Sequence, residues 1–318
     1  MDTSPAEFWI LLGVVALLVA ATAIVRGLAG AGRIAEAQGR ELMLRIRTWG
    51  FLVPVLMLPV ILGPVALKVA AGILGLCCAR EFSRATGLFR ERGVSALVYV
   101  AIGLLTIASI SGIDTLFEGA VPLLGLLIVA GAVCNDRPGG YLQRVSLGAL
   151  AFLLFGVGIG YLGQLADQAG SGRIVLWLLL CIALNDVAAY LCGNLWGHRK
   201  LCPNISPGKT VAGALGAVVF TCVFGAVVGQ MMRLPIDSTL MLAIAAALCS
   251  VCGTIGDLII SSVKRDVGIK DMSAALPGHG GILDRFDSLL LAAPFLYYFI
   301  LWTHKFDSIQ GTSLVSGV

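Results

Sequence analysis

Long apolar runs, which recur from one end of this 318-residue chain to the other, constrain its fold more than any other feature. A helix needs ~20 apolar residues to cross the hydrocarbon core of a bilayer, so each run predicts one membrane-spanning helix. The runs are continuous and do not alternate with polar residues, which argues against a β-barrel. Charged residues make up 13% of the chain, against about 25% in soluble domains.

The runs predict an all-α fold, a polytopic transmembrane helical bundle of about nine to ten spans. We expect residues 1–170 to form an amino-terminal scaffold and lipid-access region, and residues 171–318 to form the catalytic region. The spans are expected at about 8–25, 50–63, 66–79, 94–111, 119–133, 145–165, 172–192, 210–231, 238–260 and 286–303.

Two of these spans leave alternatives open. Residues 8–25 resemble a signal peptide, but no Lys or Arg precedes them, so we expect a retained span. Gly63-Pro64 is expected to make a tight turn between two spans, or to belong to a re-entrant segment.

Positively charged residues predict the orientation of the bundle. If each run crosses once, 18 of the 22 Lys and Arg residues fall in segments on one side, and these segments are 26–47, 80–93, 134–144, 193–209 and 261–285. Positive charge marks cytoplasmic loops, so we expect these segments in the cytoplasm and the amino terminus outside. Residues 26–47 are expected to lie in the headgroup region, and Glu81 is expected to pair with Arg80 or Arg84.

A first polar cluster begins with Asn185 and Asp186 inside an apolar run and ends with the segment from Ser206 to Thr210. We expect this segment to open a helix, where free N–H groups and Lys209 can bind phosphate. The alternative is a simple helix cap by Ser206 with a snorkelling lysine. The spacing is not that of a P-loop, because Pro203 stands where that motif requires glycine.

A second polar cluster follows Asp257, which also lies in an apolar run. A carboxylate in such a helix costs several kcal/mol unless it faces a polar cavity or a cation. The alternative is a buried aspartate that only joins helices. The polar residues and glycines of this cluster are Ser261, Lys264, Arg265, Lys270, Asp271, Gly278, His279, Gly280, Gly281, Asp284, Arg285 and Asp287.

The residue types of the two clusters favour one kind of chemistry. Asp284 and Asp287 are spaced to share a helix face, and hard carboxylate oxygens suit Mg²⁺. The basic side chains would balance phosphate charge, and the glycines would let a ligand approach the backbone. The residues alone therefore indicate a membrane enzyme that handles a nucleoside triphosphate with Mg²⁺. A transporter that uses intramembrane aspartates to bind a coupling cation is the alternative class, although no inverted repeat is visible.

The second cluster also resembles a known signature. Ser261-x-Val263-Lys264-Arg265, Lys270-Asp271, the segment Leu276 to Gly281 and Asp284-Arg285-x-Asp287 together resemble the signature of the phosphatidate cytidylyltransferases, or CDP-diglyceride synthases. Asn185-Asp186 and Ser206-Pro207-x-Lys209-Thr210 are similar to a second region of that family. The resemblance is strong over about residues 180–303.

The resemblance implies transfer of the cytidylyl group of CTP to phosphatidate in phospholipid biosynthesis, at the inner membrane of a bacterium. It implies Mg²⁺, with K⁺ as a possible second cation, held by Asp257 and Asp284 with support from Asp186 and Asp287. A homodimer is the family's habit, and nucleic acid is not a partner. The catalytic residues that it implies are Asp257, Asp284, Lys264 and Arg265. The substrate contacts that it implies come from Asn185, Ser206, Lys209, Thr210, Ser261, Lys270, Asp271, Gly278, His279, Gly280, Gly281 and Arg285.

The sequence departs from the family pattern at several positions. Val187 stands in place of the usual Thr, Val211-Ala212 in place of Trp-Glu, and Ile260 in place of Glu. Residues 45–49 and the extra amino-terminal span resemble a paralogous branch of cytidylyltransferase-like proteins. The acceptor therefore stays open between phosphatidate and another lipid phosphate, such as a polyprenyl phosphate.

Overall fold

The computed structural model describes residues 13, 19–20, 22–27, 36–168, 171–236, 238–276 and 280–315. The long helices of this part of the chain are α2 (Glu36–Leu62), α3 (Pro64–Thr86), α4 (Arg92–Ile110), α5 (Asp114–Gly131), α8 (Ser171–Trp196), α9 (Val211–Met231), α10 (Thr239–Asp266) and α12 (Leu289–Val315). Shorter helical pieces are η1 (Leu88–Arg90), η2 (Ala132–Asn135), α6 (Tyr141–Ala151), the π-helix η3 (Phe152–Gly158), α7 (Ile159–Gln164), η4 (Leu165–Asp167) and α11 (Leu283–Phe286). Strands β1 (Lys200–Cys202) and β2 (Ser206–Thr210) pair antiparallel.

The predicted all-α transmembrane bundle is confirmed. In the described residues, eight helical segments are long and apolar enough to cross a membrane. The expected span at 8–25 lies mostly outside those residues. The expected span at 66–79 lies within α3, whose sequence also contains Lys68, Arg80, Glu81 and Arg84, and α3 is not one of the eight. The division at residue 170 stays a prediction.

The predicted turn at Gly63-Pro64 is present. Gly63 joins α2 to α3 with a φ of 104°, a conformation that side chains other than hydrogen disfavour. Pro64 begins α3, where its missing N–H costs nothing. Of the basic segment 26–47, the residues from Glu36 onward form the first turns of α2.

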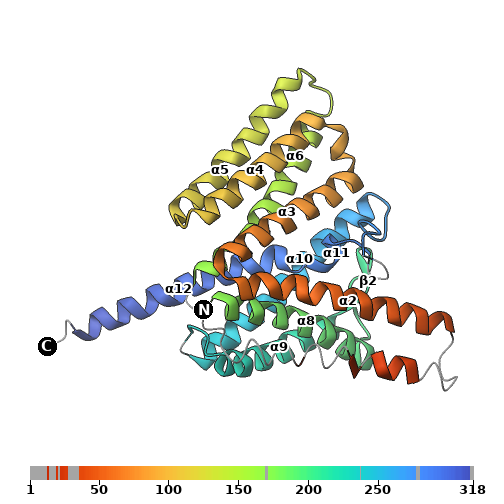
Figure 1. Cartoon of the computed structure of the whole chain (residues 1–318), viewed down its shortest axis with the longest axis vertical. Coiled ribbons are helices and arrows are strands. Elements are labelled where there is room, and N and C mark those ends of the chain that lie inside the picture. The colour runs from red at the N-terminus through yellow and green to blue at the C-terminus, as the bar shows by residue number, and fades with distance from the viewer. Residues whose placement is uncertain are drawn as a thin grey trace.

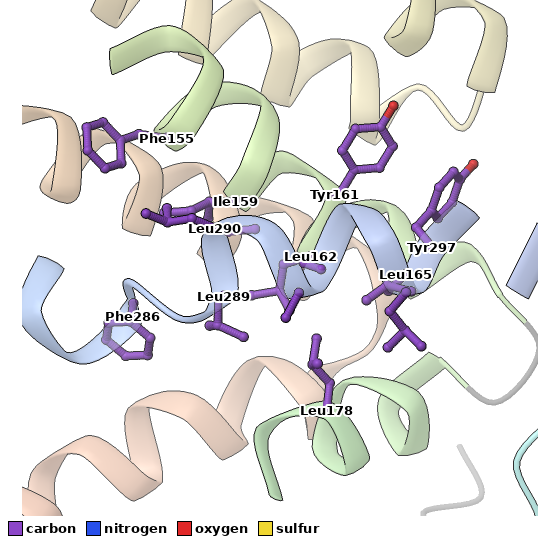
Figure 2. Close-up of a cluster of buried hydrophobic side chains, with 14 of the residues drawn as sticks. Phe155, Ile159, Tyr161, Leu162, Leu165, Leu178, Phe286, Leu289, Leu290 and Tyr297 are labelled. Atoms are coloured by element: carbon purple, nitrogen blue, oxygen red, sulfur yellow. The ribbon is translucent and has the colours of Figure 1, made fainter. Parts of the chain in front are cut away.

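The first part of helix α12 lies between the two groups of helices that make up the bundle (Figure 1). It packs against η3 and α7 on one side and against α10 on the other, so it joins the group α3 to α7 to the group α8 to α10. Figure 2 shows this packing: Leu289, Leu290 and Tyr297 of α12 lie beside Ile159, Leu162 and Leu165, with Leu178 of α8 below them. A Cβ on Gly158 would lie 2.5 Å from the carbonyl oxygen of Leu290, so the close approach of η3 requires glycine there.

The polar segments gather at one end of the bundle, which we call the site end. Glu91 pairs with Arg144, Ser273 donates to Glu81, and Arg265 donates to the carbonyl oxygen of Ile205. These contacts join the segments 80–93, 134–144, 193–209 and 261–285, as the charge pattern predicts. A further buried lysine, Lys68, lies at the opposite end, where it contacts Asp167 and the carbonyl oxygen of Ser109.

Candidate active site

A polar cavity of about 320 Å³ opens at the site end. Helices α8, α9 and α10 and strand β2 all contribute to its wall. Its polar lining comes from Asn185, Asp186, Lys209, Thr210 and Asp257, with Thr254 one turn before Asp257. The two carboxylates that the sequence places inside apolar runs therefore face one cavity, which satisfies the requirement that such residues have a polar environment.

The segment that brings Lys209 to this cavity differs from the prediction. Residues 206–210 form strand β2 of a short hairpin rather than the first turn of a helix. The residue before a proline avoids the helical region, and a β-branched threonine suits a strand, so Ser206 and Thr210 both favour the extended conformation. The cap of α9 is Thr210, whose hydroxyl accepts a hydrogen bond of 3.1 Å from the Gly213 N–H. The proposed cap by Ser206 is wrong.

Lys209 and Asp257 form an ion pair at the cavity wall, which we call the cavity pair. Their Nζ and Oδ2 atoms lie 2.6 Å apart, and the two side chains are 26% and 29% exposed. The other oxygen of Asp257 accepts a 3.1 Å hydrogen bond from Ser261, one turn later on α10. The pair is therefore open to a ligand in the cavity.

Glycines of α10 bring Asp287 close to this pair. A Cβ on Gly256 would lie 2.5 Å from the carbonyl oxygen of Asp287, and Gly253 faces Ser288. Asp287 is buried, and its carboxylate accepts a 2.8 Å hydrogen bond from the Ser288 N–H. Asp186, Asp257 and Asp287 come from three helical segments and lie within electrostatic reach of one another. A cation or the ammonium of a lysine reduces the repulsion between such carboxylates.

Asp284 has a different environment. One oxygen pairs with Lys264 Nζ at 2.8 Å, and the other accepts hydrogen bonds of 2.9 Å from the N–H groups of Met272 and Gly281. The side chains of this pair, which we call the loop pair, are 11% exposed for Lys264 and 5% for Asp284. Asp284 thus holds together both ends of the segment 272–281, and it is not among the residues that line the cavity.

Glu81 of α3 completes this arrangement, and the sequence reasoning missed it. Its carboxylate accepts hydrogen bonds from the Ser273 hydroxyl at 2.7 Å, the Ile282 N–H at 3.0 Å and the Leu283 N–H at 2.9 Å. These partners lie 192 to 202 residues later in the chain, so the expected pairing with Arg80 or Arg84 is wrong. Glu81 is buried, and a buried carboxylate requires such donors. The signal that could have found it is a glutamate at the end of an apolar helical run.

The remaining predicted residues lie around these two pairs. Asn185 lines the cavity and also accepts a 2.5 Å hydrogen bond from Ser250, which joins α8 to α10. Arg265 donates to the carbonyl oxygens of Ile205 and Ile269, both at 3.2 Å, and so holds the hairpin turn. Lys270, Asp271 and Arg285 are exposed, and Gly280 packs beside Asp271 and Asp284. Gly278 and His279 lie outside the described residues.

The carboxylates fit Mg²⁺ in one particular way. The described residues contain no group of three or more His, Cys, Asp or Glu side chains that could hold a metal ion by themselves. Proteins commonly bind Mg²⁺ through one or two carboxylates, with water and substrate phosphates completing the shell. Asp186 and Asp257 supply such a pair of carboxylates at the cavity. The ammonium group of Lys209 against Asp257 shows that this carboxylate can accept a positive charge from the cavity.

The chain resembles known proteins over most of its length. Residues 43–303 match the model of the Cytidylyltransferase family. The sequence is 34% identical over 295 residues to the uncharacterized protein YnbB of Escherichia coli, covering 90% of this chain and 95% of that protein.

Relatives with a named activity match a shorter part of the chain. The phosphatidate cytidylyltransferase of Staphylococcus epidermidis is 37% identical over 164 residues, which cover 51% of this chain and 63% of that enzyme. That of Bacillus subtilis is 43% identical over 134 residues, which cover 42% of this chain and 49% of the enzyme. The chain therefore spans about half to two thirds of these two enzymes. The chain is an integral membrane protein with a helical bundle and a polar site at one end of it, and it belongs to the cytidylyltransferase family.

Proposed function

We propose that this protein transfers the cytidylyl group of CTP to phosphatidate and releases pyrophosphate. The observation that carries the proposal is the cavity pair, Lys209 and Asp257, which shares a polar cavity with Asp186 at one end of a transmembrane bundle. Family membership and the names of two relatives favour the same reaction.

The reaction requires positioning more than acid–base chemistry. An oxygen of the phosphatidate phosphate forms a bond to the α-phosphorus of CTP, and the bond from that phosphorus to the β-phosphate oxygen breaks. The second pKa of a phosphate monoester is about 6, so the attacking group is largely ionised at neutral pH and no general base is needed. The protein must therefore hold two anions in line and reduce their repulsion.

The residues of the cavity supply these functions in the proposal. Lys209 would exchange Asp257 for a phosphate of CTP, since a lysine ammonium serves as a mobile point charge. Mg²⁺, when bound, neutralises phosphate charge and activates the α-phosphorus toward attack. Asp257 and Asp186 would hold the metal, and Lys264 lies on the same helix two turns after Asp257. K⁺ as a second cation and a homodimer stay predictions.

The acceptor has one specific alternative. The match that covers 90% of this chain is to a protein without a named activity, whereas the two named enzymes match about half of it. Val187, Val211 and Ala212 also replace residues that are usual in the resembled family. The same transfer to another lipid phosphate, such as a polyprenyl phosphate, is therefore the second candidate. A transporter is disfavoured, because its coupling-ion site would be expected near the midplane of the bilayer.

The orientation is also part of the proposal. The four basic segments that gather at the site end are expected in the cytoplasm, where CTP is available. We propose the inner membrane of a bacterium, with the amino terminus outside.

Pyrophosphate release from purified protein in detergent tests the proposal. The reaction contains CTP and Mg²⁺, with phosphatidate, with a polyprenyl phosphate, or without lipid, and Asp257→Asn is the matched control. Release that requires phosphatidate and Asp257 is the expected result. Release only with the polyprenyl phosphate would favour the second candidate. If neither lipid supports pyrophosphate release, both candidates are contradicted.

A further inference from the structure

An apolar groove of about 310 Å³ lies between α2, α3 and α8, apart from the polar cavity. Its wall is made of aliphatic and aromatic side chains with a single cysteine, Cys77. Phe51 and Val55 of α2 and Ala70 of α3 line its length, and Ile282 and Phe286 line its end at α11. Such a groove offers no polar partner to water.

The location of the groove favours hydrocarbon as its occupant. α2 contains a candidate membrane span and exposes Phe51, Val55 and Leu58 to its surroundings, so one wall of the groove is a helix with a lipid-facing surface. An empty groove would lose dispersion contacts on its open side. Its lining on α3 extends from Leu67 to Cys77, which is about 15 Å at the rise of a helix. That length is about half of the ~30 Å hydrocarbon core, or one leaflet.

One end of the groove meets the site. Cys77 lies one turn before Glu81 on α3, and Glu81 accepts hydrogen bonds from the N–H groups of Ile282 and Leu283. Phe286 lines the groove, while its neighbour Asp287 lies within electrostatic reach of Asp257. Two consecutive residues therefore connect the groove with the carboxylates of the site: Phe286 lines the groove, and Asp287 interacts with Asp257.

We propose that this groove holds an acyl chain of the lipid phosphate acceptor, with the phosphate beside Ile282 and Phe286 and the chain running along α3 toward Leu67. The proposal rests on the proposed function, since it gives the acceptor of that reaction its place. The acceptor would then be a lipid of the site-end leaflet, and only a chain that reaches Ala70 would depend on the full length of the groove.

Chain length provides the sharpest test. Ala70 lies 11 residues before Glu81 on α3, about 16 Å along the axis. A chain of eight carbons is shorter than this distance, and an oleoyl chain extends beyond it. In the Ala70→Phe variant, we expect kcat/KM for dioleoyl phosphatidate to fall at least about tenfold, the effect of a methylene-scale misfit in a hydrophobic pocket. The value for dioctanoyl phosphatidate should stay close to wild type.

The matched control is Ala96→Phe on α4, an exposed position that is not among the residues lining the groove. It should leave the rates with both lipids unchanged. An equal effect of Ala70→Phe on both lipids, or no effect on either, overturns the proposal.

A second measurement needs neither turnover nor a folded variant. Wild-type protein is irradiated, without CTP, with a phosphatidate that has a photoreactive group midway along one acyl chain, and the labelled residues are mapped by mass spectrometry. Labels on residues 51–59 and 70–77 support the groove, and labels confined to the exposed faces of other helices overturn it. Because labelling does not require catalysis, a wild-type protein that is labelled in the groove but releases no pyrophosphate would contradict the proposed function alone.

Discussion

Two lysine–aspartate pairs lie at the same end of this bundle, and they are built for different tasks. In the cavity pair, both side chains keep about a quarter of their surface exposed, and Asp257 receives one further side-chain hydrogen bond. In the loop pair, Asp284 is 5% exposed, and three donors occupy its two oxygens. The first pair can exchange its partners for a ligand, whereas the second would have to release a segment of the chain. The same residue types thus provide binding in one place and support in the other.

The largest expected effect is on turnover when the cavity pair is broken. Asp257→Asn removes a negative charge that faces the cavity, and we expect the rate of pyrophosphate release to fall at least about a hundredfold. Stability should change little, because the pair is partly exposed and such pairs contribute about 0–1 kcal/mol. Turnover at fixed CTP and thermal unfolding in detergent measure the two quantities. A variant that unfolds early would place Asp257 with the loop pair instead.

The loop pair should show the reverse balance. Asp284→Asn leaves Lys264 buried without its counter-charge, and breaking a buried pair in this way costs about 3 kcal/mol. A double variant with Lys264→Met removes both charges, so it should recover part of the stability but none of the activity. The free energy of unfolding across this cycle separates the two effects. If Asp284→Asn unfolds like wild type, the segment does not depend on this carboxylate, and its role would be that of a ligand.

Glu81 should act as a positioning residue with an intermediate effect. In Glu81→Gln, the amide nitrogen cannot accept one of the three hydrogen bonds, and the negative charge near the first N–H groups of α11 is lost. Residues that orient active-site groups typically contribute 10–100-fold, so we expect kcat to fall about tenfold with KM for CTP nearly unchanged. Glu91→Gln is the control, because Glu91 pairs with Arg144 at the same end. Equal kcat values in the two variants would leave Glu81 without this role.

The difference between the two pairs also explains what the sequence could predict. Apolar runs and basic loops depend on local composition, so the bundle and the gathering of polar segments at one end follow from them. Asp257 and Asp186 were identifiable because each interrupts an apolar run. The partners of Glu81 were not, because they lie some 200 residues away and two of the three are backbone N–H groups. The strand at 206–210 was missed because the same residue types suit two structures. They are found at the start of a phosphate-binding helix, and also in a strand whose last threonine caps the next helix.

The smallest expected effect concerns a third pair, Lys68 and Asp167, at the opposite end of the bundle. A variant of this pair tests whether a buried ion pair outside the site affects turnover. Lys68 is 4% exposed, contacts Asp167 at 2.7 Å and donates to the carbonyl oxygen of Ser109 at 2.7 Å. Lys68→Met keeps the length of the side chain but leaves that carbonyl unsatisfied, which costs about 2 kcal/mol. We expect an earlier thermal transition in detergent and unchanged rates at temperatures where the protein is folded. A loss of turnover below that transition would mean that the two ends are coupled through α3, which contains both Lys68 and Glu81. The loop pair would then be one part of a support that runs the length of that helix.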